Sequence, residues 1–400
     1  MSQMPGLLSI EEALRRVLTR ARPLDAERVA ISAAAGRFLA EDVTARVDLP
    51  PFASSAMDGY ALRADDTPGR LPVVFRIAAG APAGRPLAAG EAMAISTGGA
   101  VPEGADSVVP LEVVVESDNE LQVAASVAAG AHVRPRGGDV RAEDVVLSAG
   151  TRIGAAQLGA LAAVGIADVL VGRRPRVVVL STGTELRAPG EPLGAGQIYE
   201  SNGPMLVAAL EAAGAEVERI GPVADDESEH RLALERGLAA DVLVSSGGVS
   251  VGPHDLVRRI LAELGVEEDF WGVAVRPGKP IAFGTRGGTL VFGLPGNPVS
   301  SLVAVELFVR PALLALQGAT DPGPSYEVAR LASPLRRNAA RDELARARTK
   351  RDSEGTLLEP LTGQESHMIA RAAGADALVL VPAGEGELAA GDLARYLRLT

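Results

Sequence analysis

The sequence has 400 residues, enough chain for roughly two to four domains, and this length excludes a peptide-sized scaffold. Hydrophobic residues make up 47% and charged residues 22%, which excludes intrinsic disorder, and the absence of cysteine excludes disulfides and thiolate chemistry. The formal net charge of -12 disfavours nucleic-acid binding, because the field repels phosphate backbones and no Lys/Arg-rich block opposes it.

The N-terminal segment predicts a helix. Ser9 and Glu12 have the spacing of a capping box, and Ile10, Leu14 and Val17 recur at helical spacing. The apolar stretch ahead of them is far too short for a signal sequence, so we expect a cytoplasmic protein.

The chain from Asp48 to Leu147 is predicted to form an antiparallel β-domain, because short β-branched runs alternate there with Pro and Gly. The runs are Val73–Ile77, Ala92–Ser96, Ser107–Pro110 and Glu112–Val115. A second helix is predicted over Thr151–Val164. Our hypothesis is that it packs with the first helix, so that the β-domain is inserted between them.

From residue 176 onward, apolar strands alternate with helical segments. The predicted segments, strand first, are Val177–Leu180, Pro204–Ala213, Val217–Gly221, Ser228–Leu238, Asp241–Ser245 and Asp255–Leu264. This alternation predicts a doubly wound α/β domain, whose parallel sheet is covered by helices on both faces. Pro280–Gly284 and Thr289–Gly293 predict a hairpin on the same sheet.

Asn297 followed by Pro298 predicts the start of a helix. The apolar stretch Val299–Leu316 is interrupted by Glu306 and Arg310, which favours a buried amphipathic helix over a membrane span. Beyond this helix, short charged strands predict a small C-terminal β-domain.

Three loops of small residues follow predicted strands, at 181–185, 245–255 and 293–298. Ligands of an open α/β sheet bind at the carboxyl ends of its strands, and such loops let an anion approach backbone N–H groups. A phosphate-bearing ligand is therefore the natural guess. The alternative is that the glycines only make tight turns.

Carboxylates recur beside these loops, at Glu185, Asp225, Asp226 and Asp255. Hard oxygen ligands next to a phosphate site are what Mg²⁺ requires. The alternative for Asp225 and Asp226 is that they stabilise the N-terminus of the helix that follows.

Arg276 and Lys279 flank a Pro-Gly turn, which suits an oxyanion, although a solvated basic turn is the alternative. Asp58 stands alone in an apolar loop, where a plain Asp-Gly turn is the alternative. The segments Ser96–Gly99 and Arg134–Asp139 have the same ambiguity. The histidines have no metal-ligand spacing, which disfavours zinc.

Six motifs in this order carry a family resemblance: PPFASSAMDGYAL, ISTGGAVPEGAD, STGTEL, SSGGVSVGPHD, VRPGKPIAFG and GLPGNPVSSLVAVELFVRPAL. Together they closely resemble the molybdopterin molybdenumtransferase family, which is related to the C-terminal domain of gephyrin. The resemblance implies a helical linking domain (1–47 and 140–174), an inserted β-domain (48–139), an α/β molybdopterin-binding domain (175–320) and a C-terminal β-barrel-like domain (321–400).

The resemblance also implies an enzyme, a transferase of molybdenum that acts as a homodimer. Its substrates are molybdate and adenylylated molybdopterin, its cofactor is Mg²⁺ or a similar divalent ion, and it releases AMP as the molybdenum cofactor forms. Expected partners are a molybdopterin adenylyltransferase and downstream cofactor-handling proteins, with no nucleic acid and no membrane. The alternatives are a non-catalytic molybdopterin-binding scaffold and a molybdopterin adenylyltransferase.

Site residues follow from the same resemblance, position by position. The catalytic set is Asp58, Thr97, Asp139, Glu185, Asp225, Asp255 and Lys279, of which Asp58 would come from the partner subunit and Glu185, Asp225 and Asp255 would bind the metal. The substrate-binding set is Thr182, Gly183, Ser246, Gly247, Gly248, Ser250, Arg276, Pro295, Gly296, Asn297, Ser300, Arg346 and Ser366. This sequence departs from the family at Thr184, where Asp is usual, and at Glu143, where Gly is usual.

Overall fold

The computed structural model describes residues 6–223, 226–247 and 256–399, and its contacts divide the chain into two units. One unit comprises residues 28–35 and 41–170, and the other comprises residues 1–27, 36–40 and 171–400. The finer division into four domains stays a prediction.

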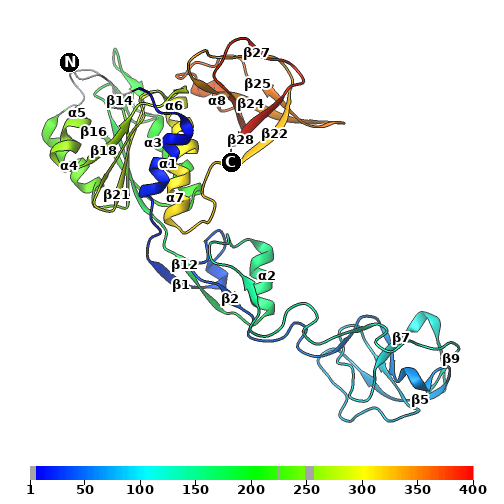
Figure 1. Cartoon of the computed structure of the whole chain (residues 1–400). Helices are drawn as coiled ribbons and strands as arrows, with labels where there is room; N and C mark the ends of the chain where they lie inside the picture. The colour runs from blue at the N-terminus through cyan, green and yellow to red at the C-terminus, as the bar shows by residue number, and fades with distance from the viewer. Residues whose placement is uncertain (1–5, 224–225, 248–255, 400) are drawn as a thin grey trace. The chain divides into compact units, whose positions relative to one another are not determined.

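The unit of residues 28–35 and 41–170 contains a mixed β-sheet in the order β7-β4-β6-β5-β9-β8 (Figure 1). Its strands are β4 (Gly59–Leu62), β5 (Gly69–Ile77), β6 (Ala92–Ile95), β7 (Ser107–Pro110), β8 (Val115–Ser117) and β9 (Glu120–Val123). The expected antiparallel domain is wrong in one respect, because β5 and β6 run parallel. The connection between them is long enough to return the chain to the same end of the sheet.

The fourth predicted run in this sheet is also corrected. Residues Leu111–Val113 form a 3₁₀ turn, η3, and β8 begins only at Val115. The shorter strands of this part of the chain are β1 (Ala26–Ala30), β2 (Val43–Thr44), β3 (Ser54–Ser55), β10 (Val133–Arg134), β11 (Val145–Leu147) and β12 (Asp168–Gly172).

The two predicted helices belong to different units, so the hypothesis that they pack together stays a prediction. Helix α2 (Ala155–Ala163) contacts β11 and the 3₁₀ turn η1 (Ile31–Ala33) within its own unit. Helix α1 (Ile10–Arg20) is capped by Ser9, as predicted, but buries its apolar face in the core of the other unit. There it packs against the long buried helix described below.

The second unit contains a sheet in the order β16-β13-β17-β21-β20-β18. Its strands are β13 (Arg176–Thr182), β16 (Glu216–Val223), β17 (Val242–Ser246), β18 (Glu267–Trp271), β20 (Ala282–Arg286) and β21 (Thr289–Leu294). The first three and β21 run parallel, and β20 and β21 form the predicted hairpin. The edge strand β18 went unpredicted because it begins with three acidic residues, an unusual start for a strand.

Helices cover both faces of this sheet, as the α/β alternation predicts (Figure 1). The helices are α3 (Asn202–Ala212), α4 (Glu227–Gly237), α5 (Leu256–Glu263), α6 (Pro298–Ala304) and α7 (Arg310–Leu316). Along β13, Val177 and Val179 enter the core with α1, α3 and α7, whereas Val178 and Leu180 enter the core with α4 and α5. Successive side chains of the strand point to opposite faces of the sheet and therefore contribute to the hydrophobic cores on both faces.

Helices α6 and α7 are joined by a π-helical segment, η4 (Val305–Val309). The combined helix is long and apolar enough to cross a membrane, but 83% of its apolar window is buried inside the unit. The expected burial is therefore confirmed, although the helix is buried nearly all round rather than amphipathic. Its two charged residues form an ion pair, with Arg310 Nε 2.8 Å from Glu306 Oε2 and Arg310 Nη2 donating to Glu306 Oε1 at 3.1 Å.

The C-terminal region forms a closed β-barrel in the order β24-β25-β22-β28-β26, with β26 pairing back to β24. Its strands are β22 (Tyr326–Leu331), β24 (Asp342–Asp352), β25 (Gly355–Pro360), β26 (Ala377–Val381) and β28 (Leu393–Arg398). The barrel-like prediction is confirmed. Short elements complete this region: β19 (Val275–Arg276), which pairs with β24, β23 (Leu335–Arg336), β27 (Glu387–Leu388) and helix α8 (Ile369–Ala372).

Candidate active site

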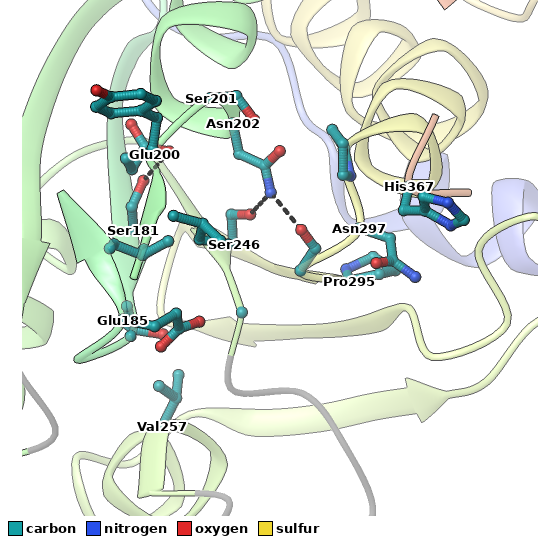
Figure 2. Close-up of a pocket in the computed structure, with 18 of the residues that line it drawn as sticks. Ser181, Glu185, Glu200, Ser201, Asn202, Ser246, Val257, Pro295, Asn297 and His367 are labelled. Carbon is teal, nitrogen blue, oxygen red and sulfur yellow. Dashed lines mark hydrogen bonds between the residues drawn. The ribbon is translucent and has the colours of Figure 1, made fainter. Parts of the chain in front are cut away.

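The loops after β13, β17 and β21 meet at one edge of the sheet and line a pocket of about 700 Å³ (Figure 2). This convergence was expected for parallel strands. The predicted site residues that line the pocket are Thr182, Gly183, Glu185, Ser246, Gly247, Pro295, Gly296 and Asn297.

At two glycines of this pocket, an added Cβ atom would lie too close to a neighbouring atom. Gly183 has a φ of +149°, and a Cβ there would lie 2.7 Å from Glu185 Oε2. Gly247 has a φ of +93°, and a Cβ there would lie 2.9 Å from the carbonyl oxygen of Thr182. Tight turns therefore do require glycine here, and the same turns bring the loops together around one pocket.

Glu200 is a pocket residue that the sequence reasoning missed. It follows β15 (Ile198–Tyr199), which pairs with β14 (Leu186–Arg187), and it is only 1% exposed. Its carboxylate accepts hydrogen bonds from Ser181 Oγ at 3.2 Å, from the backbone N–H of Gly203 at 2.6 Å and from Arg219 Nη2 at 2.6 Å. Both carboxylate oxygens are thus satisfied despite burial.

Asn202 was also missed, and it connects two of the three loops. Its Nδ2 donates to Ser246 Oγ at 2.7 Å and to the carbonyl oxygen of Gly296 at 2.7 Å (Figure 2). The signal in the sequence was a Glu-Ser-Asn segment at the start of a helix. Such a segment is typical of an N-cap, and this local role gives no indication that the Asn202 side chain contacts two distant loops.

Two histidines that are far apart in the sequence, His230 and His367, line the same pocket. His230 is 1% exposed, and its Nδ1 lies 2.9 Å from the carbonyl oxygen of Asp226. Because a carbonyl only accepts, Nδ1 carries the hydrogen in this contact. No spacing in the sequence predicts that these two histidines lie near one another.

Of the predicted metal ligands, Glu185 has an exposed side chain at the pocket. Asp225 and Asp255 lie outside the described residues, as do Gly248 and Ser250. Within the described ranges, no group of three or more His, Asp or Glu residues is arranged to hold a metal ion.

Asp226 follows the alternative interpretation, in which an acid stabilises a helix N-terminus. Its carboxylate accepts from the backbone N–H groups of Ser228 and Glu229, both at 3.0 Å, and so caps α4. Hydrogen bonds from the Ser228 hydroxyl and these N–H groups hold the pKa of Asp226 below its ordinary value.

The predicted cationic turn lies beside a second cavity of about 930 Å³, which Arg276 lines. Arg276 Nη1 lies 3.4 Å from Glu343 Oε2, and burial raises the pKa of Glu343 despite this neighbour. Lys279 is exposed, whereas Ser300 on α6 is 3% exposed. Gly278 of the turn packs over the carbonyl oxygen of Ser300, because a Cβ on Gly278 would lie 3.6 Å from it.

Arg346 and Ser366 hold the loop that follows β25. Arg346 is 1% exposed, and its Nη2 donates to the carbonyl oxygen of Gly363 at 2.8 Å and its Nη1 to that of Glu365 at 3.3 Å. Ser366 Oγ accepts from Asn297 Nδ2 at 2.8 Å. The guanidinium of Arg346 is therefore committed to the loop backbone, and its predicted role toward molybdate stays a prediction.

The other unit holds the remaining predicted residues. Asp58 Oδ1 accepts from the backbone N–H of Thr97 at 2.7 Å, so these two positions are adjacent, and Asp139 is exposed. Glu143 has a φ of +75°. The turn thus keeps the left-handed conformation for which Gly is better suited.

Comparison with known proteins extends along nearly the whole chain. Residues 8–165 match the MoeA N-terminal region (domain I and II), residues 178–315 match a probable molybdopterin binding domain, and residues 328–399 match the MoeA C-terminal region (domain IV). Molybdopterin molybdenumtransferase 2 of Mycobacterium tuberculosis (strain H37Rv) is 38% identical, with 98% of this chain and 100% of that protein covered.

Two further proteins match this chain over nearly its whole length. Molybdopterin molybdenumtransferase of Haemophilus influenzae is 33% identical, with 96% of this chain and 97% of that protein covered. The crystal structure of the molybdopterin biosynthesis moeA protein from Pyrococcus horikoshii OT3 aligns with a TM-score of 0.86 at 28% identity, covering 98% of this chain and 100% of that one. From these matches and the convergent pocket, the chain belongs to the molybdopterin molybdenumtransferase (MoeA) family.

Proposed function

We propose that this protein is a molybdopterin molybdenumtransferase, which inserts molybdenum from molybdate into adenylylated molybdopterin and releases AMP. The observation that carries the proposal is the convergence of three glycine-rich loops on one pocket of the region that matches a molybdopterin binding domain. Backbone N–H groups and hydroxyls at such an edge suit the phosphates that link the pterin to the nucleotide.

The pocket supplies groups for hydrolysis of that linkage. The oxygen of a water molecule would form a bond to one phosphorus as the bridging P–O bond breaks, and the bridging oxygen would leave with the other phosphate. The exposed carboxylate of Glu185 is suited to accept the proton that the water loses. Molybdate would then enter as substrate, and the sulfurs that bind molybdenum would come from the pterin.

We propose that a divalent ion binds at this edge, where Glu185 is an exposed carboxylate, because Mg²⁺ prefers carboxylates together with phosphate oxygens. Glu185, with Asp225 and Asp255, would hold it. When bound, Mg²⁺ would neutralise negative charge on the phosphates.

The exposed side chain of Lys279 and the turn that begins at Arg276 are proposed to bind molybdate, together with the C-terminal loop of Ser366. Two cations on a rigid turn suit a small dianion without the ordering of long side chains.

Release of AMP from adenylylated molybdopterin, measured with and without molybdate, tests the proposal. We expect molybdate-dependent release that falls at least about a hundredfold in Lys279→Ala, with unchanged thermal unfolding. An adenylyltransferase would instead consume ATP, and a scaffold would release nothing. Molybdate-independent release, or none, would reject the proposed function.

The proposed homodimer has a separate test, since Asp58 would act in the partner's site. Asp58→Ala and Lys279→Ala each inactivate a different half of a shared site. Mixed dimers of the two variants should regain about a quarter of wild-type activity, because half of the dimers are mixed and each has one intact site. No recovery on mixing would mean that both residues serve the same chain, or that no dimer forms.

A further inference from the structure

Two serines at the carboxyl ends of adjacent strands have opposite hydrogen-bonding roles. Ser181 of β13 and Ser246 of β17 are register partners, and both line the pocket. The Ser181 hydroxyl donates to the buried carboxylate of Glu200, so its hydrogen is already used. The Ser246 hydroxyl instead accepts from the amide of Asn202.

The orientation of the Asn202 amide follows from its second partner. The carbonyl oxygen of Gly296 can only accept, so the side-chain atom 2.7 Å from it must be the nitrogen. The two hydrogens of that nitrogen are then shared between Gly296 and Ser246 Oγ. Asn202 is 8% exposed and has little freedom to turn over.

The Ser246 hydroxyl therefore has a hydrogen that is not used in its contact with Asn202. The residue is 3% exposed, and it donates no hydrogen bond to any residue in the described ranges. A buried donor without an acceptor is costly, and the open space beside this one is the pocket. An acceptor on a ligand in the pocket would satisfy this hydroxyl.

We propose that Asn202 is a positioning residue that makes the Ser246 hydroxyl a donor to a phosphate oxygen of the substrate. This inference rests on the proposed function for the identity of the substrate. A donor aimed in advance at a negatively charged oxygen binds it more strongly than a freely rotating hydroxyl does. Ser181, whose hydrogen is held by Glu200, is the matched control.

ADP is a suitable probe, because it carries a pyrophosphate linkage and its binding needs no turnover. By titration calorimetry, Ser246→Ala should weaken ADP binding about tenfold, and Ser181→Ala should change it less than about twofold. Ser246→Thr keeps the hydroxyl and should restore binding. Asn202→Asp presents only acceptors, draws the Ser246 hydrogen back, and should also weaken binding about tenfold.

The double variant Asn202→Asp/Ser246→Ala distinguishes positioning from a general structural effect. Its loss of ADP binding should be smaller than the two separate losses combined, because the part that acts through the absent hydroxyl disappears and only repulsion between the new carboxylate and the phosphates remains. Three results would overturn the inference. They are additive losses of ADP binding in the double variant, a loss in Ser181→Ala equal to that in Ser246→Ala, and no ADP binding by the wild-type chain. Weakening of molybdate binding with unchanged ADP binding would overturn it as well.

If Asn202→Asp does not fold, Asn202→Ala takes its place: it removes the amide that fixes the Ser246 hydroxyl and should weaken ADP binding in a chain with Ser246 but not in Ser246→Ala. The wild-type assay of molybdate-dependent AMP release separates the two proposals. A chain that binds ADP as described but releases no AMP would retain this inference and lose the proposed function.

Discussion

Gly183 faces the carboxylate of Glu185 so closely that a methyl group on Gly183 would lie 2.7 Å from Oε2. We predict that Gly183→Ala displaces this carboxylate and lowers the rate of AMP release about a hundredfold, since an error of about 1 Å in a catalytic group has that effect. Gly221→Ala is the control, because a Cβ there would meet nothing within 4 Å. Equal rates in the two variants would contradict the placement of Glu185.

Asp241 anchors the start of the parallel sheet. It accepts from Arg173 Nη1 at 2.8 Å and Nη2 at 3.0 Å, and from the backbone N–H of Arg176 at 2.7 Å. Burial acts to raise the pKa of Asp241, but the hydrogen bonds outweigh it and hold the pKa below its ordinary value. We predict that Asp241→Asn lowers the free energy of unfolding at pH 7 by about 2 kcal/mol.

This contribution depends on pH in a defined direction. Because the pKa is lower in the folded state, the stabilisation is full above the ordinary pKa of 3.8 and is lost as pH falls through the folded value. Urea unfolding of the wild type and of Asp241→Asn should therefore differ at pH 7 and converge toward pH 3. The exposed acid Glu235, changed to Gln, is the control. A difference that grows toward low pH would refute the assignment.

Substitution of Arg346 distinguishes between two roles of this residue, holding the loop after β25 and contacting molybdate. If its main task is to hold the loop after β25, Arg346→Lys should lower the free energy of unfolding by about 3 kcal/mol, because a lysine cannot reach the same carbonyl oxygens with its single ammonium group. Arg348→Lys, two residues along β24 and exposed, should change little. Normal stability with a raised KM for molybdate would instead favour the direct contact predicted from the sequence.

Gly159 lies within helix α2, and a Cβ there would meet nothing within 4 Å. We predict that Gly159→Ala raises the free energy of unfolding by about 0.5–1 kcal/mol, because alanine restricts the unfolded chain more and favours the helix. Thermal unfolding checks this, with AMP release unchanged. A loss of stability would show that a neighbour occupies this space.

The sequence by itself determined those features that depend on neighbouring residues. Continuous apolar runs such as Val177–Leu180 predict buried parallel strands, and the capping pattern at Ser9 predicts the start of α1. Glycine-rich loops after such strands predict a binding edge, because parallel strands end on one side of the sheet. These are local signals, and the structure confirms the strands, the helix start and the convergence of the loops on one pocket.

Only the tertiary structure decided which distant groups meet. Three contacts depend on residues that are distant in the chain. They are the packing of α1 in its core, the parallel pairing of β5 with β6, and the hydrogen bonds of Arg346 to a loop. Asn202 resembles an ordinary residue at a helix start until its amide is found between Ser246 and Gly296. A hydrogen bond requires a distance and a direction in space, and a sequence pattern specifies neither for residues that are 44 or 94 positions apart.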